Sequence, residues 1–287
     1  MDFKQGLGSR KGSAVLVNLG LDFAGIGFSA EFRRLENMEF RMDDRTNVGS
    51  INLNYLPSLT KQHKYMLATL FPHQLEGVGE IGGQFDLFGE LFNEAFGGNA
   101  LHYTINGSLY HDLNFNGTGY DFLSFGGDLL FSEIGMELWR KWGKDLKTTF
   151  SFINQKKKEF SEYGFGDMLM NTQIVVGDIL YKFTPSTSLR GEIQHAWSDS
   201  KDNQRWVMGL LELGIAPHWM VFGSDLYNYR TVGEPVHYYS VGGSFVWQSL
   251  RASLTYGRNR AGTQCSGGVC RYVPEYSGMN MLLTFTF

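Results

Sequence analysis

The sequence predicts an all-β fold, a transmembrane antiparallel up-and-down β-barrel of which about 14–16 strands are visible. Three observations predict it. Stretches of about ten residues alternate between apolar and polar positions, which is the period of a strand with two different faces. The connections between these stretches alternate between tight and long, and the last stretch ends on an aromatic residue, Phe287. Short turns on one side and longer loops on the other are typical of an outer-membrane barrel.

The composition agrees with this class of protein. The 287 residues include 36 Gly, 23 Phe and 14 Tyr but only 6 Pro, and the mean hydropathy is -0.21. No run approaches the roughly 18 consecutive apolar residues of a transmembrane helix, which excludes a helical membrane protein. In a barrel half of each strand faces water, so the average stays polar. The net charge of -4 gives no basic surface for nucleic acid, and we expect no nucleic-acid partner.

The alternating stretches form a series that we expect to make one domain over residues 1–287. The tight connections include 142–145, 184–187 and 248–249, and the long ones include 35–47, 158–170 and 262–277. The expected strands lie near 13–20, 24–36, 48–57, 64–72, 78–90, 99–111, 126–142, 146–157, 171–183, 188–199, 204–216, 219–231, 237–248, 250–260 and 278–287.

The last stretch, 278–287, places Met279, Met281 and Leu283 on one face and more polar residues on the other. We interpret Phe287 as the signal read by the barrel-assembly machinery, because closing strands of outer-membrane barrels commonly end on Phe or Trp. A soluble β-sandwich or β-solenoid is the alternative. No repeat of 20–50 residues is visible, which argues against the solenoid, but a sandwich would show the same alternation. It gives no reason for loops to alternate in length.

The expected strand count is odd, with the C-terminus on the periplasmic side and the first strand running inward from the cell surface. A single-chain bacterial barrel normally has an even number of strands and both ends in the periplasm. The N-terminal MDFKQGLGSRKGS also has no apolar signal-peptide region. We therefore expect N-terminal sequence, with at least one further strand, to be missing.

The alternation also predicts which side chains face the lumen. Inward charges of both signs either pair across strands or line a water-filled pore. The expected pore-lining residues are Glu133, Glu137, Lys147, Asp178, Lys182, Arg190, Glu192, Gln194, Glu212, Asp225 and Arg251.

Candidate sites of other kinds are weak, and we expect no enzyme, metal or cofactor. The histidines show no HxH or HExxH spacing, and the GxGxxG match at 77–82 has no helix after it. His195 is expected to face outward, but no GxSxG motif accompanies it. Cys265 and Cys270 favour a local disulfide over two free thiols, and the lysines at 156–158 suit either lipopolysaccharide or a solvated loop base.

Several segments resemble a known family of proteins. They are NMEFR (37–41), NYLPSLTKQHKYMLATLFP (54–72), LRGEIQHAW (189–197), LLELGIAPHW (210–219), HYYSVGG (237–243) and GGVCRYVPEYSGM (267–279). Together they resemble a Bacteroidetes-type family of outer-membrane β-barrel proteins of unassigned function. The resemblance implies the fold and the outer-membrane location, with members that look longer at the N-terminus. It supplies no catalytic or binding residues.

These observations lead to two expected functions. The first is a porin-like channel or solute-uptake barrel with a polar, charged lumen, since more than a dozen strands enclose a lumen too wide for side chains to fill. The second is a structural or surface-interaction barrel that is plugged and acts in a larger complex. In both, the partners are outer-membrane lipid, lipopolysaccharide and the barrel-assembly machinery, the C-terminus is periplasmic and the long loops are extracellular.

Overall fold

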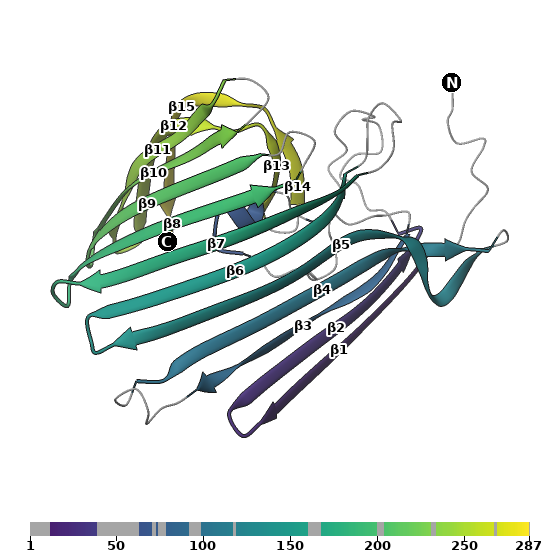
Figure 1. Cartoon of the computed structure of the whole chain (residues 1–287). Coiled ribbons are helices and arrows are strands. Elements are labelled where there is room, and N and C mark those ends of the chain that lie inside the picture. The colour runs from purple at the N-terminus through teal and green to yellow at the C-terminus, as the bar shows by residue number, and fades with distance from the viewer. Residues whose placement is uncertain are drawn as a thin grey trace.

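A computed structural model of the chain describes residues 12–38, 63–70, 73, 79–91, 99–116, 119–159, 168–199, 204–230, 234–266 and 269–286. Within these residues one 13-stranded antiparallel sheet runs in chain order from β1 to β12 and ends with β15, and β13 pairs with β14 in a separate hairpin. Figure 1 shows this succession of neighbouring strands. No helix in the described part of the chain is long and apolar enough to cross a membrane.

The strands are close to those expected from the sequence, so the all-β, up-and-down prediction is confirmed. Their bounds are β1 (Ser13–Phe23), β2 (Ile26–Glu36), β3 (Gly79–Leu91), β4 (Leu101–Phe115), β5 (Tyr120–Trp142), β6 (Leu146–Glu159), β7 (Met168–Lys182), β8 (Thr187–Ser198), β9 (Arg205–Ile215), β10 (Trp219–Arg230), β11 (Val236–Trp247), β12 (Leu250–Asn259), β13 (Gly262–Ser266), β14 (Val269–Val273) and β15 (Tyr276–Phe285).

The expected strand at 64–72 is wrong. Its described part contains a 3-10 turn, η2 (Leu67–Thr69), in place of an extended segment. Tyr65, Leu67, Ala68 and Leu70 are all buried, so burial here does not alternate as it does along a two-faced strand. The expected strand at 48–57 lies outside the described residues. The β13–β14 hairpin lies within the segment that the sequence predicted as one long loop.

The turns between β1 and β2, β5 and β6, β7 and β8, β9 and β10, and β11 and β12 have two to four residues each and lie at the same end of the sheet. The turn between β1 and β2 has only two residues, Ala24 and Gly25, with φ of 51° and 80°. Positive φ at both positions matches a type I′ turn, whose twist suits a β-hairpin. The connection between β2 and β3, by contrast, extends over residues 37–78.

The sheet curves, and β1 and β15 are its two edges (Figure 1). Within the described residues these edges are not hydrogen-bonded to each other, so the sheet is open. Because the 13 strands alternate in direction, its first and last strands run the same way. The structure therefore shows a curved sheet, and its closure into a barrel belongs to the proposals below.

The two faces of the sheet differ in how much of their side chains they expose. We call the face that carries residues 63–70 the inner face and the opposite one the outer face. Outer-face apolar side chains are largely exposed, with Ile193 at 64% and Leu211 at 63%, whereas inner-face Glu133 and Gln194 are at 5% and 1%.

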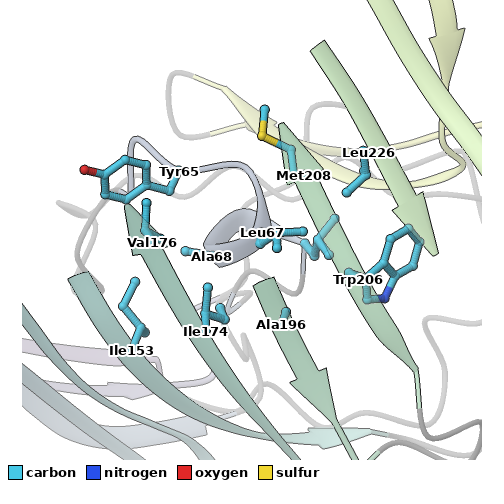
Figure 2. Close-up of a cluster of buried hydrophobic side chains, with 11 residues drawn as sticks. Tyr65, Leu67, Ala68, Ile153, Ile174, Val176, Ala196, Trp206, Met208 and Leu226 are labelled. Carbon is cyan, nitrogen blue, oxygen red and sulfur yellow. The ribbon is translucent and has the colours of Figure 1, made fainter. Parts of the chain in front are cut away.

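Residues 63–70, which we call the strap, cross the inner face. The strap's apolar residues pack on side chains from β6 to β10, and Figure 2 shows Leu67 and Ala68 of the η2 turn over these strands. The strand residues of this cluster are Ile153, Ile174, Val176, Ala196, Trp206, Met208 and Leu226. Complete burial of a side chain such as Leu67 contributes about 1.5–3 kcal/mol. The strap and the inner face of β6–β10 thus form a small hydrophobic core together.

Candidate functional site

The inner face brings together ten of the eleven residues predicted to line a pore. The register shows this directly, since Asp178 pairs with Glu192 and Arg190 with Glu212, while Gln194 pairs with Met208 of the buried cluster. The ten residues are Glu133, Glu137, Lys147, Asp178, Lys182, Arg190, Glu192, Gln194, Glu212 and Arg251. That they line a water-filled pore stays a prediction.

Asp225 is the exception, and the prediction that it faces inward is wrong. Its register partners are Gly209 on β9 and Tyr239 on β11, and Gly209 in turn pairs with the exposed Ile193. Asp225 therefore lies on the outer face, where its carboxylate meets His237 at 2.6 Å. The sequence placed it inward because a carboxylate is costly among apolar side chains, but the neighbouring histidine gives it a polar partner.

Arg190 lies at the centre of a cluster of charged side chains on the inner face. Its guanidinium donates to Oδ2 of Asp178 at 2.8 Å and also contacts Glu192. Glu192 accepts in turn from the side-chain amide of Gln194. This chain of contacts joins charges on β7 and β8 and leaves the inner wall polar but internally paired.

The strap is anchored to this wall through its main chain. The Leu67 N–H donates to Oε1 of Gln194 at 2.9 Å, and Nε2 of Gln155 donates to the Ala68 carbonyl at 3.1 Å. Arg260, just after β12, donates to the Leu70 carbonyl at 3.2 Å. These bonds satisfy polar backbone groups that would otherwise be buried without partners, which costs about 1–3 kcal/mol each.

Two basic side chains secure the first part of the strap. Nε2 of His63 lies 2.9 Å from the carboxylate of Glu133, which also accepts from Asn106 and Gln155 at 2.8 Å. Nζ of Lys64 lies 3.1 Å from Glu137. Partial burial of Lys64 disfavours its charged form, but the Glu137 carboxylate and the Tyr65 hydroxyl together outweigh this and raise the pKa of Lys64. Glu133 and Glu137, which the sequence predicted to line a lumen, therefore bind the strap. The sequence analysis did not predict this role.

A second contact fixes the connection between β2 and β3 beyond the strap. Nε2 of His73 lies 3.2 Å from Glu80, and the imidazole stacks on both Tyr110 and Phe131, with 5.1 Å between ring centroids in each pair. Glu80 also pairs with Arg33, and both side chains are buried. The long connection is thus tied to the inner face at two places, the strap and His73.

The other predicted sites are only partly described. The β13–β14 register sets Cys265 opposite Cys270, and opposed residues of antiparallel strands have Cα atoms about 4.5–5.5 Å apart, within the range of a disulfide. Their side chains and Phe287 lie outside what the structure describes, so the disulfide and the assembly signal stay predictions. Of the lysines at 156–158, Lys158 forms an ion pair with Asp128, with 2.6 Å between Nζ and Oδ2.

Metal and nucleophilic chemistry find little support in the described part of the chain. No group of three or more His, Cys, Asp or Glu side chains is arranged there to hold a metal ion. His195 faces outward, as the sequence predicted, and its Nε2 lies 2.7 Å from the Tyr229 hydroxyl. The imidazole also packs edge-on against Trp197, with ring centroids 4.1 Å apart.

Together these features define a class of protein, an all-β protein with one up-and-down antiparallel sheet, an apolar outer face and a polar inner face crossed by a strap. The particular family follows from comparison of sequences. A family model described as a family of unknown function, DUF6029, matches residues 1–287, and the chain belongs to this family. No curated protein matches the chain. The family model covers the whole chain, and its description assigns no activity to the family.

Proposed function

We propose that the chain is a non-enzymatic outer-membrane β-barrel of a Gram-negative bacterium, of the Bacteroidetes type that its sequence resembles. In this proposal it acts as a porin-like channel or solute-uptake barrel with a polar, charged lumen. The observation that supports it best is the contrast between the faces, with Ile193 and Leu211 exposed outside and Glu133 and Gln194 buried inside. Such a sheet suits lipid outside and water or polar chain inside.

The dimensions of the strands support the same proposal. A strand crosses a bilayer with about 9–11 residues when it is tilted. On the outer face of β10, the exposed aromatic residues Trp219 and Tyr229 are separated by ten positions. This is about 33 Å along the strand and about 25 Å in height at a tilt near 40°, equal to the usual distance between the two aromatic girdles of a barrel.

A membrane-spanning form of this sheet needs both of its edges paired. The bilayer core offers no water to the N–H and C=O groups of an exposed edge strand. Because β1 and β15 run in the same direction, direct pairing of the two would be parallel. Antiparallel closure takes an odd number of further strands between them. We propose this closure, with the C-terminus in the periplasm and the long loops outside the cell.

The strap favours a second candidate function, a plugged barrel that acts in a larger outer-membrane complex. Its main-chain bonds to Gln194 and Gln155 and its buried Leu67 occupy inner-face positions that an open channel would leave to water. In both candidates, lipid and lipopolysaccharide surround the outer face and the barrel-assembly machinery recognises Phe287.

Recordings in planar bilayers separate the two candidates. The protein, with the further strands that antiparallel closure needs included, is refolded in detergent, checked for heat-dependent migration on gels as a sign of a closed barrel, and inserted into the bilayer. Stable single-channel steps support the channel. A correctly folded, inserted barrel without conductance would refute the channel and support the plugged barrel. A chain that neither shifts on heating nor inserts would contradict the membrane proposal itself.

A further inference from the structure

Two arginines lie side by side on the outer face, at the end of the sheet opposite the short turns. Arg205 begins β9 and Arg230 ends β10, and the register pairs the two directly. The turn of this hairpin, at 216–218, is at the other end. On its other side Arg205 pairs with Trp197 of β8, whose side chain is 36% exposed. Two positive charges thus stand next to an exposed aromatic ring at this rim of the sheet.

A β-bulge brings both arginines to the same face. The pairing passes from Asn228 with Trp206 to Arg230 with Arg205, so Tyr229 is an extra residue on β10. In a regular strand Arg230 would share the inner face with the buried Asn228, whereas the bulge turns it to the side of Arg205. The side-chain amide of Asn228, with its nitrogen towards the bulge, donates to the Arg205 and Arg230 carbonyls at 3.0 and 2.9 Å. A buried side chain therefore fixes the two backbones together.

Neither of the two guanidinium groups has a carboxylate partner among the described residues. Like charges on directly opposed residues destabilise a pair of strands. The inner face solves the same problem within the chain, since Arg190 is paired with Asp178. On the outer face Asp199, two residues after Trp197, accepts from the Asn171 N–H at 2.5 Å on the β7 side. The pair of arginines therefore fits an anion that comes from another molecule.

Aromatic side chains next to the arginines indicate their depth in a membrane. Trp197, His195 and Tyr229 form a contiguous group on the outer face, joined by the bond between the imidazole and the phenol. Amphipathic rings of this kind settle at the level of the lipid headgroups. Towards the short turns, the same face becomes apolar, with Ile193 and Leu211 exposed. The arginines thus lie at the level of headgroup phosphates, with a surface for acyl chains beside them.

We propose that Arg205 and Arg230 bind a phosphate group of lipopolysaccharide in the outer leaflet. The inference rests on the membrane-spanning part of the proposed function, which sets this rim outside the cell. Guanidinium groups bind phosphate oxygens through parallel N–H donors, and basic pockets on membrane-embedded proteins bind phosphorylated headgroups. A free phosphate ion would use the arginines alone. A lipid also covers the exposed apolar side chains next to them, which is why the lipid is the favoured ligand.

Binding of lipid A, the phosphorylated anchor of lipopolysaccharide, tests the proposal. The protein, with the strands that closure needs included, is folded in detergent and immobilised, and its affinity for lipid A is measured by surface plasmon resonance. We expect the wild type to bind lipid A more tightly than the same lipid without its phosphate groups. Arg205→Gln and Arg230→Gln should each weaken the binding of lipid A by about tenfold, because each removes a charge-assisted contact to phosphate. The double variant should bind both forms of the lipid equally.

Lys156→Gln is the matched control, because it removes one positive charge from the same face and rim at β6, three strands from Arg205. It should leave the affinity unchanged. An equal loss in this control, or equal binding of both forms of the lipid by the wild type, would overturn the site. Competition by inorganic phosphate at the concentration at which lipid A binds would overturn the lipid as its ligand. A heat-modifiable, inserted barrel that fails these tests refutes the site alone, whereas failure to insert refutes the membrane proposal together with it.

Discussion

The anchoring of Leu67 on the inner wall leads to a quantitative prediction. Leu67 is fully buried among residues of β7–β9, and replacement of a buried leucine by alanine costs roughly 2–5 kcal/mol. If the whole cost falls on the docked strap, the equilibrium between docked and undocked strap shifts by about 30- to 4,000-fold, since each 1.4 kcal/mol is tenfold. Leu67→Ala should therefore raise single-channel conductance or open a silent barrel.

Two measurements check this prediction. The first is conductance in planar bilayers, and the second is protease cleavage within the strap, which should be slow in the wild type and fast in Leu67→Ala. Leu254→Ala is the matched control, because Leu254 lies on the outer face of β12 and its side chain is 48% exposed. Unchanged conductance together with an equally protected strap would show that the strap does not regulate the lumen. Rapid cleavage without any change in conductance would show that another part of the chain blocks it.

Three further predictions concern other contacts. Arg190→Gln removes the positive charge among two carboxylates and should shift the reversal potential towards cation selectivity; an unchanged potential would mean that this cluster is sealed from the conducting path. Mass analysis of unreduced protein should find Cys265 and Cys270 protected from alkylation, and labelling of both would refute the disulfide. Glu80→Gln leaves the buried Arg33 without its ion pair and should lower stability by about 3–5 kcal/mol, seen as a lower midpoint of the heat-dependent gel shift.

The strands were predictable because the two-residue period of a sheet with one apolar face is visible in the sequence. On β8, Leu189, Ile193 and Trp197 alternate with Arg190, Glu192 and Gln194, and the register confirms both faces. Ten of the eleven proposed lumen residues were placed on the correct face for the same reason. The tight turns at 142–145, 184–187 and 248–249 followed from the breaks in this alternation.

The strap could not be predicted by that reasoning. Its apolar residues suggested a strand, but they pack on side chains about 85–160 positions later in the chain, and local periodicity carries no information on such contacts. The polar residues at His63 and Lys64 were the available signal, because basic side chains beside a buried apolar turn need polar partners nearby. Asp225 was misplaced for a related reason, since its partner His237 lies on another strand.

The position of the strap also restricts the order in which the molecule can assemble. Leu67 precedes β8 in the chain, yet its N–H bonds to Gln194, 127 residues later. The strap therefore has to wait, undocked, until the hairpins from β5 to β9 have been synthesised and paired, because contacts over such separations form late. If the sheet then closes, the strap must already lie inside it, or it must enter through the mouth. A nascent chain that closes too early would leave the strap outside the sheet. Correct assembly therefore requires that the strap docks before the two edges of the sheet are joined.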